Sequence, residues 1–355
     1  MRIFCYFVEP ASYTLDLIKN VYNNIQIDYC FINSHTFAKS DFTTEKVFLD
    51  KLSFFSKFKF LISVYTNYDI IIVNGYNNYC FFITFILNLF SVRKKYIAID
   101  SDTQLRIPGN LLKRLIKWVY LSTIFRNKYI LGFAGGTKTH KDLFRHYGMN
   151  ENRIFFIPMM VDNTKFYTDK KKFPEIFTFL YVGRLVSHKN VEGLIQQFRE
   201  KFSNKRAILK IVGCGKDGHY LRNKYASNNV FFLGELYNED LVVEFKSASC
   251  FVIASNFEPW GLVVNEALSA SLPVIAYKEV GAVHDLIKGK SNGMIAEDMC
   301  TFGNMMLNLY NDSGLLMEFS KNAANVMRNY WNYELYLESL MKVIKRVKKS
   351  ARYIS

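Results

Sequence analysis

Two glutamates bracket a turn in the segment SNFEPWGLVVNEAL. Glu258 and Glu266 lie eight positions apart, and a proline and a glycine between them precede a run of good helix formers. This order predicts a helix start whose first backbone N–H groups lack partners, those of Gly261, Leu262 and Val263. Such a helix start suits a phosphate group, and carboxylates suit hydroxyl groups. The segment therefore favours a ligand that carries both, such as a nucleotide sugar.

A second candidate segment, GRLVSHKN, follows the predicted strand Phe177–Val182. Gly183 allows a tight turn there, Arg184 offers a bidentate fork, and Lys189 offers a point charge. Transfer of a glycosyl group leaves negative charge on the departing diphosphate, so fixed cations can stabilise that charge. The alternative is that both side chains are solvated surface cations, which are common in a chain with 46 Lys and Arg.

Together these segments resemble glycosyltransferase family 4, the group 1 glycosyltransferases. The family pattern is a Gly-Arg-Leu turn with a following Lys-Gly or Lys-Asn, and then Glu-x7-Glu. The resemblance extends from about Thr178 to Gly293, and three further elements occur in the family's order, Ile211–Gly215, Val230–Gly234 and Asn292-Gly293. The N-terminal half matches only in outline.

The resemblance implies a retaining, metal-independent transferase without a cofactor. It assigns Arg184 and Lys189 to the diphosphate, Glu258 to the hydroxyls of the donor sugar, and Glu266 to the ribose. Gly213 could let the base or the ribose approach the backbone closely, and Leu236 would belong to the segment that lines the nucleobase pocket. Each residue also has a structural explanation: a glutamate that stabilises a helix start, a solvated helix glutamate, or an ordinary turn between strand and helix.

The elements that must position these residues alternate as short apolar runs and amphipathic ones, which is typical of α/β proteins. Eleven strands are predicted, at Arg2–Val8, Ile27–Ile32, Ile70–Val73, Tyr96–Ile99, Tyr129–Phe133, Ile154–Ile157, Phe177–Val182, Ala207–Val212, Val230–Leu233, Cys250–Ala254 and Pro273–Ala276. The resemblance implies an acceptor domain over residues 1–165, a donor domain over 175–330 and a helix over 331–355 that crosses back onto the first domain. Two Rossmann-like doubly wound domains across a cleft are the GT-B architecture of the resembled family.

The triplet Asp100-Ser101-Asp102 follows a predicted strand and allows several roles. Asp-x-Asp holds Mg²⁺ or Mn²⁺ in the other glycosyltransferase fold, but that fold lacks the two segments described above. We expect Asp102 or Asp100 to face the cleft from the acceptor side, and a helix N-cap is the alternative for either. None of the six histidines forms a metal-spaced pair.

Composition limits the class of protein. At 355 residues with half of them hydrophobic, the chain is long enough for two domains. Six scattered cysteines without a Cys-x-x-Cys motif are typical of a reduced, cytoplasmic protein. The apolar stretch Cys80–Phe90 is shorter than a membrane span and predicts a buried helix. The net charge of +15 favours an anionic partner.

Residues 106–128 interleave cations with apolar side chains and are a candidate contact with an anionic membrane. The alternative is an outer helix with its apolar stripe on the sheet. Similar helices occur in members of the resembled family that glycosylate membrane lipids. That resemblance implies a saccharide or lipid-linked saccharide acceptor, a role in the synthesis of a bacterial surface polysaccharide, and a peripheral place on the inner membrane face. Two departures from the family are the absence of glycine after the first strand, at Glu9-Pro10, and Ser271 at a usual glycine position.

Three other functions stay open. A relative of the same fold could act as a nucleotide-sugar epimerase or as a hydrolase through Glu258 and Glu266. A nucleic-acid-binding protein would explain the charge, but the cations are dispersed and no known motif appears. An NAD dehydrogenase would use Gly213–Gly218, which fits Gly-x-Gly-x-x-Gly, but would leave Arg184 and Lys189 without a role.

Overall fold

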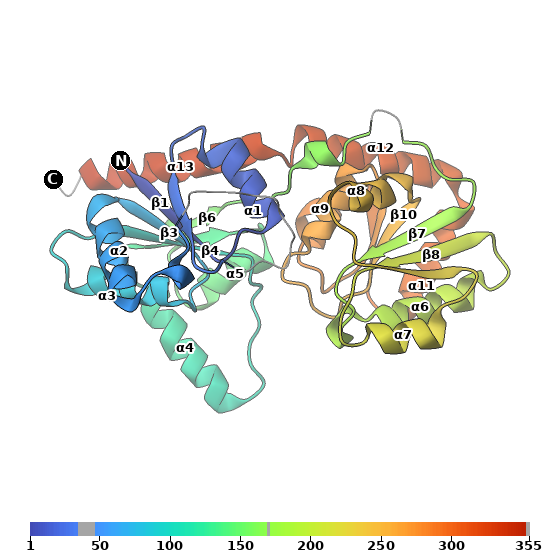
Figure 1. The fold of residues 1–355 in the computed structure, drawn as a ribbon, viewed down its shortest axis with the longest axis horizontal. Coiled ribbons are helices and arrows are strands. Elements are labelled where there is room, and N and C mark those ends of the chain that lie inside the picture. Colours follow the sequence, from blue (N-terminus) through green and yellow to red (C-terminus); the bar gives the residue numbers. More distant parts are fainter. Residues whose placement is uncertain (35–46, 169–170, 353–355) are drawn as a thin grey trace. The chain divides into compact units, whose positions relative to one another are not determined.

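The structure is a computed structural model that describes residues 1–34, 47–168 and 171–352. It divides into two compact units (Figure 1). Unit 1 comprises Met1–Met160 and Tyr333–Ser355, and unit 2 comprises Val161–Asn332. Each unit contains a six-stranded parallel sheet with helices around it.

In unit 1 the strand order is β2-β1-β3-β4-β5-β6, and every neighbouring pair is parallel. The strands are β1 (Ile3–Phe7), β2 (Asp28–Phe31), β3 (Ile70–Asn74), β4 (Tyr96–Ser101), β5 (Ile130–Ala134) and β6 (Ile154–Phe156). The helices are α1 (Ser12–Leu17), a π-helical turn (Ile18–Tyr22), α2 (Phe54–Asn67), α3 (Tyr79–Phe90), α4 (Leu111–Phe125), α5 (Thr139–His146) and α13 (Tyr333–Arg352).

In unit 2 the strand order is β12-β11-β10-β7-β8-β9, again all parallel. The strands are β7 (Phe177–Val182), β8 (Ala207–Val212), β9 (Val230–Gly234), β10 (Cys250–Ile253), β11 (Val274–Tyr277) and β12 (Gly293–Ala296). The helices are α6 (Val191–Phe202), α7 (Gly218–Tyr225), α8 (Asn238–Ser247), α9 (Leu262–Ser269), α10 (Val283–Leu286), α11 (Met299–Asn311) and α12 (Ser313–Asn329). Four short 3-10 turns complete the chain, at Leu49–Lys51, Glu151–Arg153, Asn163–Lys165 and Ser187–Lys189.

All eleven predicted strands are present, with ends that differ by one or two residues. Their apolar, β-branched and aromatic runs fit strands buried on both faces of a parallel sheet. The strand that the sequence analysis missed is β12, whose four residues Gly-Met-Ile-Ala give little signal. It joins the edge of the sheet, where Gly293 lies opposite Val274, and a Cβ at Gly293 would collide with the Val274 carbonyl.

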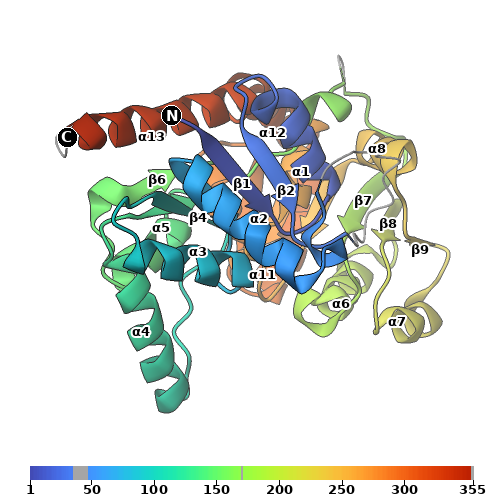
Figure 2. The ribbon, with the colours of Figure 1, turned by 60° about the vertical axis from the view of Figure 1, so that its left-hand side comes forward.

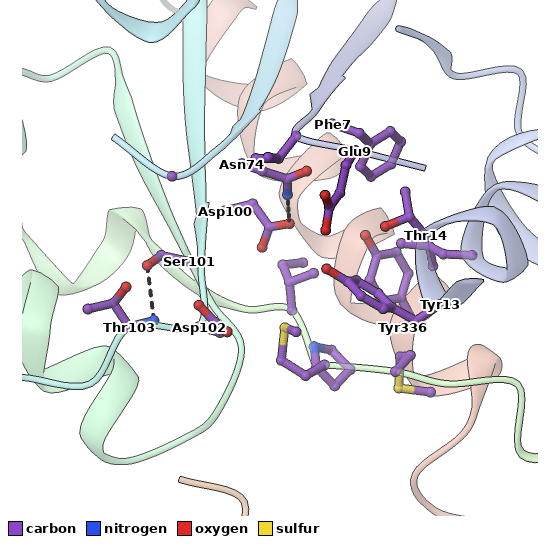
Figure 3. A pocket seen from close by; sticks show the side chains of 17 residues that line it. Phe7, Glu9, Tyr13, Thr14, Asn74, Asp100, Ser101, Asp102, Thr103 and Tyr336 are labelled. Atoms are coloured by element: carbon purple, nitrogen blue, oxygen red, sulfur yellow. Dashed lines mark hydrogen bonds between the residues drawn. The ribbon is translucent and has the colours of Figure 1, made fainter. Parts of the chain in front are cut away.

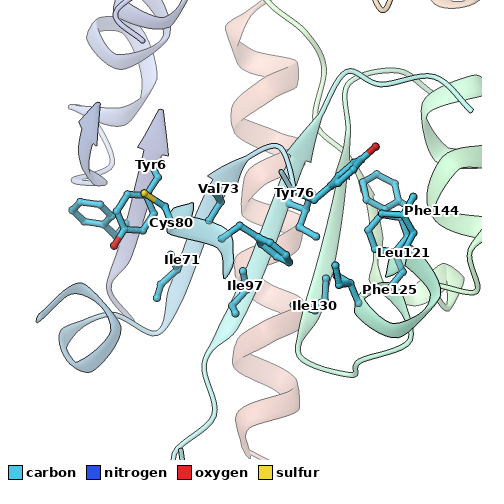
Figure 4. Packing of buried hydrophobic residues seen from close by; sticks show 14 of the residues in the cluster. Tyr6, Ile71, Val73, Tyr76, Cys80, Ile97, Leu121, Phe125, Ile130 and Phe144 are labelled. Atoms are coloured by element: carbon cyan, nitrogen blue, oxygen red, sulfur yellow. The ribbon is translucent and has the colours of Figure 1, made fainter. Parts of the chain in front are cut away.

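The cores lie between the sheets and the helices. In unit 1 one core joins the sheet to α2, α3, α4 and α5 (Figure 4), through residues such as Ile71, Val73, Leu121, Phe125 and Phe144. On the other side, α13 packs against the π-helical turn. The hydroxyls of Tyr22 and Tyr336 are 3.1 Å apart, and both side chains are buried.

The boundary between the units falls at Met160 and Val161, ahead of the segment that the sequence analysis placed between its two domains. The turn Asn163–Lys165 belongs to unit 2. The Asn163 amide donates to the carbonyls of Met327 and Trp331 at 2.9 and 2.7 Å, and accepts from the Ser269 hydroxyl at 3.0 Å. A buried asparagine with these partners ties the turn to α9 and α12, and composition alone gave no sign of it.

The prediction of a buried helix over Cys80–Phe90 is only half right. The inner face of α3 is buried through Cys80, Phe81, Thr84 and Asn88. Its outer face exposes Phe82, Ile86, Leu89 and Phe90. An almost wholly apolar sequence carries no period that could mark an exposed face, so the sequence could not distinguish the two sides.

Candidate functional site

The candidate donor site lies in unit 2, at the carboxyl ends of β7 and β10. These neighbouring strands mark the reversal of strand order, because the chain proceeds from β7 through β8 to β9 on one side and through β10, β11 and β12 on the other. In open parallel sheets the loops after such a pair of strands diverge and leave room for a ligand. The loop after β7 carries Arg184 and Lys189, and the loop after β10 carries Glu258.

Lys189 and Glu258 form an ion pair. The ammonium contacts the Glu258 Oε2 atom, and the two side chains are only 12% and 13% exposed. The loops are also joined through the backbone, where Asn256 N–H donates to the His188 carbonyl at 2.8 Å. These contacts bring together two predicted site residues that lie 69 positions apart.

Arg184 lies beside the same pair and is exposed. Tyr181 lies at the end of β7, and its hydroxyl donates to the Arg184 carbonyl at 3.2 Å. Burial raises the pKa of Tyr181, the charge of Glu258 raises it further, and the charge of Arg184 opposes that shift. Both charges therefore act on one buried phenol, and Arg184 is an exposed cation.

The turn at Asn190 explains the Lys-Asn step of the sequence pattern. Asn190 has φ +52° and lies in the left-handed region, which asparagine and glycine tolerate best. It ends the 3-10 turn that carries His188 and Lys189 and begins α6. The pattern is thus a backbone requirement that holds Lys189 at the start of the next helix.

Helix α9 begins where the sequence analysis placed it. Gly261 precedes it in the left-handed region, with φ +94°, and in the described part of the chain no side chain caps this end. A Cβ at Gly261 would come within 3.0 Å of Glu258 Cγ, so glycine allows that side chain to lie close. Leu262 and Val263 follow as half-buried residues of the first turn. Backbone N–H groups at such a helix start are suited to a phosphate.

The backbone of Glu258 forms an isolated parallel β-bridge with Val280, which the sequence analysis did not predict. Its N–H donates to the Glu279 carbonyl at 3.2 Å, and its carbonyl accepts from Gly281 N–H at 3.0 Å. Trp260, two residues on, is buried, stacks on Trp331 with ring centroids 5.5 Å apart, and donates to Asn265 at 2.8 Å. The turn is therefore fixed on both sides of the carboxylate.

The remaining predicted donor residues lie at the ends of β8, β9 and α9. Gly213 approaches the loop after β7 so closely that a Cβ there would collide with the Gly183 carbonyl, and its N–H donates to the Gly234 carbonyl at 2.6 Å. Leu236 is half-buried in the loop after β9. Glu266 lies one turn into α9 and is partly exposed. The loops of three neighbouring strands, β7, β8 and β9, thus meet around Gly183 and Gly213.

Asp102 lies in unit 1, on a cavity of about 270 Å³. The cavity lies where the strand order of unit 1 reverses, between the ends of β1 and β3, and Figure 3 shows Glu9, Asp100 and Asp102 around it. Asp100 accepts from the Asn74 amide at 2.7 Å. Burial raises the pKa of Asp100 to about 7, the nearby Asp102 charge adds to that rise, and the Asn74 bond opposes it.

The N-cap alternative for these aspartates is wrong. Asp100 is a residue of β4, Asp102 follows that strand directly, and the next helix is capped by Asn110. Among the residues that the structure describes, no three His, Cys, Asp or Glu side chains gather in a way that could hold a metal ion.

Residues 162–326, nearly the whole of unit 2, match the family model of the glycosyl transferases group 1. Unit 2 is therefore similar to the group 1 glycosyl transferases over almost its full length. A curated relative is the poly(glycerol-phosphate) alpha-glucosyltransferase of Bacillus subtilis, which is 26% identical over 201 residues, 55% of this chain and 30% of that protein. The chain spans no more than half of the length of curated relatives such as this one.

Two solved structures resemble the whole chain. The sucrose-phosphate synthase of Thermosynechococcus elongatus superposes with a TM-score of 0.72 at 16% identity, over 99% of this chain and 100% of that one. Anabaena HepE, solved in complex with UDP and glucose, gives a TM-score of 0.70 at 17% identity, over 97% and 99% of the two chains. These likenesses confirm the predicted GT-B fold.

The structure brings the unit 2 predictions together around the ends of β7, β8, β9 and β10. The sequence analysis missed Tyr181, Trp260 and Glu279. Tyr181 is hidden in a buried strand, and Trp260 stands inside the motif, where its stacking partner lies 71 positions away. Glu279 contacts Glu258 through its backbone carbonyl. Every residue type has that group, so the sequence gives no sign of this contact.

Proposed function

We propose that this protein is a retaining, metal-independent glycosyltransferase. It moves a hexosyl or related group from a nucleoside diphosphate sugar to a saccharide or lipid-linked saccharide acceptor, in the synthesis of a bacterial surface polysaccharide. The observation that carries the proposal is the meeting of Lys189, Glu258 and the uncapped start of α9 at the ends of β7 and β10. Cation, carboxylate and helix start are the three partners that a nucleotide sugar requires.

The chemistry assigns a separate task to each group. When the bond between the anomeric carbon and the phosphate oxygen breaks, the leaving diphosphate gains negative charge, which Arg184, Lys189 and the N–H groups of α9 stabilise. Glu258 binds hydroxyls of the donor sugar and stabilises positive charge on its ring. Glu266 binds the ribose, and Gly213 and Leu236 line the place of the nucleoside. Asp102 is proposed to act on the acceptor from the cavity of unit 1.

The match of unit 2 to the family model and the nature of its relatives support this proposal. The Anabaena structure holds UDP and glucose, and the Bacillus relative is named for transfer of glucose to a poly(glycerol phosphate). A cytoplasmic location and contact of residues 106–128 with an anionic membrane are parts of the same proposal. None of the described helices is both long and apolar enough to span a bilayer.

The first test is a thermal-shift screen of UDP-, GDP- and ADP-sugars. A donor present at about 100 times its Kd should stabilise the protein by ~2.7 kcal/mol. With the donor known, release of nucleoside diphosphate should depend on a saccharide or lipid-linked acceptor, and the product should keep the anomeric configuration of the donor. Release of free sugar without acceptor would identify a hydrolase instead, and stabilisation by none of these donors would contradict the proposal.

A further inference from the structure

The outer faces of α2, α3 and α4 in unit 1 expose large apolar side chains. Phe55 near the start of α2 is 83% exposed, and Phe90 at the end of α3 is 85% exposed. On α4, Leu111 is 75% exposed, and Leu112, Leu115 and Ile116 are also exposed. We call the outer faces of these three helices the apolar helix surface.

The three helices are neighbours on one face of the unit 1 sheet (Figure 2). Helix α2 packs beside α3, and the rings of Phe82 on α3 and Tyr120 on α4 lie 6.1 Å apart. Their inner sides contribute to one buried core. The exposed side chains are therefore not the loose ends of poorly packed helices, because the same helices are well packed on the side that faces the sheet.

Helix α4 is exposed on all sides over its first turns. Its buried residues, Leu121, Ser122, Ile124 and Phe125, all lie near its end. The first turns, which begin after the N-cap Asn110, project beyond the sheet in Figures 1 and 2. Leucine and isoleucine on a projecting helix remain in contact with water unless a partner covers them, and an apolar patch of this kind marks an interaction site.

The charge around this surface restricts the partner. Residues 51–141, which contain all three helices, carry 14 Lys and Arg against three Asp and no Glu. On α4, Lys113 and Arg114 are exposed between the apolar side chains. An anionic partner would pair with these cations. A partner with hydrocarbon chains would shield the leucines and isoleucines from water. An anionic lipid bilayer provides both at one interface.

Two other occupants fit less well. A second copy of this chain would bring two identical basic faces together in a symmetric contact, and like charges would oppose that contact. Nucleic acid would pair with the cations and could stack on aromatic rings, but it offers nothing to the aliphatic side chains of α4.

We propose that the apolar helix surface docks this protein onto an anionic lipid bilayer, with α4 in the interface and α2 and α3 beside it. The proposal extends the contact expected for residues 106–128 to two helices in which the sequence analysis found no exposed face. It deepens the membrane contact that the proposed function includes and does not rest on the sugar donor. Its failure would remove that contact and leave the proposed transfer reaction intact.

The test is flotation of the full chain with vesicles of phosphatidylcholine, with and without phosphatidylglycerol. The protein should float with the phosphatidylglycerol vesicles, and added salt should weaken this binding. The double variants L112S/I116S on α4 and F54S/F55S on α2 should each lose binding by about tenfold or more, because each removes apolar side chains from the interface. The variant K113Q/R114Q should lose about tenfold through charge alone.

Matched controls exist in unit 2, where Val243 and Met317 are similarly exposed apolar side chains. Val243→Ser and Met317→Ser should bind as the unchanged protein does. Circular dichroism and thermal midpoints should match among all variants, which distinguishes lost docking from lost folding.

Tryptophan fluorescence gives a second, independent measurement. The chain has three tryptophans; Trp260 and Trp331 are buried in unit 2, and Trp118 on α4 is 44% exposed. Phosphatidylglycerol vesicles should shift the emission to the blue, lipids brominated along the acyl chain should quench it, and Trp118→Phe should abolish both effects. Equal flotation of the double variants and the unchanged protein would overturn the proposal, as would absence of flotation. A lipid-independent dimer, or a nucleic-acid complex, that L112S/I116S abolishes would also overturn it and identify another occupant.

Discussion

At the scale of single residues, Lys189 and Glu258 are proposed to bind different parts of one ligand, and the structure shows that they also bind each other. Both side chains are mostly shielded from water, so neither charge is left without a partner before the donor arrives. A diphosphate must therefore compete with Glu258 for the ammonium of Lys189. The ion pair holds both side chains in place and should lower the affinity of Lys189 for the nucleotide.

Glu258→Gln should separate these two roles. Without the competing carboxylate, Lys189 should bind nucleoside diphosphate about fivefold more tightly, which corresponds to ~1 kcal/mol. Sugar transfer should fall sharply, because the amide lacks the charge that stabilises the sugar ring. Calorimetric titration with nucleoside diphosphate and a turnover assay measure the two effects.

Glu175→Gln is the matched control, since Glu175 forms an exposed ion pair with Arg206 in the same unit. It should change neither diphosphate affinity nor turnover. If Glu258→Gln instead weakened diphosphate binding, Glu258 would serve to position Lys189 rather than to compete for it.

Asp100 predicts a pH dependence of stability. Its folded-state pKa of about 7 lies above the ordinary value of 3.8, so the folded protein favours the protonated form. The stability that this preference provides is complete below about pH 4 and is lost as the pH rises towards 7, by ~1.4 kcal/mol for each pH unit. Asp100→Asn does not titrate and should escape this loss.

Urea denaturation of both proteins near pH 5 and near pH 8 measures this difference. The advantage of Asp100→Asn over the unchanged protein should be larger near pH 8. An advantage, or a deficit, of the same size at both pH values would show that Asp100 titrates normally in the folded protein.

At the scale of elements, Ser271 shows the cost of a departure from the family. It follows α9 and has φ +58°, in the left-handed region that glycine adopts without penalty. Its N–H donates to the Leu268 carbonyl at 3.0 Å, and Leu272 N–H donates to the Ala267 carbonyl at 2.9 Å. The Ser320 hydroxyl holds the Ser271 carbonyl at 2.7 Å. These bonds keep a strained residue in place.

Ser271→Gly should stabilise the protein by about 0.5–1 kcal/mol, because it removes the Cβ from a left-handed position. Thermal unfolding measures the gain. Ser271→Ala keeps the Cβ and should gain nothing, so equal effects of the two substitutions would place the strain elsewhere.

How far the sequence predicts these elements depends on how local their cause is. Strands such as Phe177–Val182 are evident because a run of apolar and aromatic residues is itself the cause of a buried strand. The start of α9 is evident because Pro259 and Gly261 stand beside it. The hydrogen bond from Asn256 to His188, the stacking of Trp260 on Trp331 and the carbonyl of Glu279 behind Glu258 are not evident, because each depends on which strands become neighbours.

The surface of unit 1 was harder to predict than its core. Residues 106–128 were considered either as a membrane contact or as an ordinary outer helix. The first turns of α4 project from the sheet because of the path that residues 102–110 take. The pattern of apolar and polar residues does not predict that path. The exposed face of α3 was missed for a related reason, since an apolar sequence on all sides suits both a core and a lipid interface.

At the scale of the whole molecule, each unit places a polar site where its own strand order reverses. In unit 2 the reversal lies between β7 and β10 and holds cations, a carboxylate and a helix start. In unit 1 it lies between β1 and β3 and holds a cavity with Glu9, Asp100 and Asp102. The two sites differ in charge, as expected if one receives a diphosphate and the other a hydroxyl-bearing acceptor.

Turnover should be insensitive to EDTA, because the proposal assigns the leaving diphosphate to Arg184, Lys189 and the start of α9. The assay compares nucleoside diphosphate release with and without EDTA at saturating donor. Loss of activity that Mn²⁺ restores would instead assign Asp100 and Asp102 as metal ligands.

The central claim is that fixed cations of unit 2 hold the diphosphate of the donor. The most direct measurement is the affinity of Arg184→Ala and Lys189→Ala for the nucleoside diphosphate and for the corresponding nucleoside, with Arg206→Ala as an exposed control. Each site variant should lose about 10- to 100-fold for the diphosphate, as expected for a charge-assisted hydrogen bond, and little for the nucleoside. Equal losses for the two ligands, or no loss for either, would contradict the account.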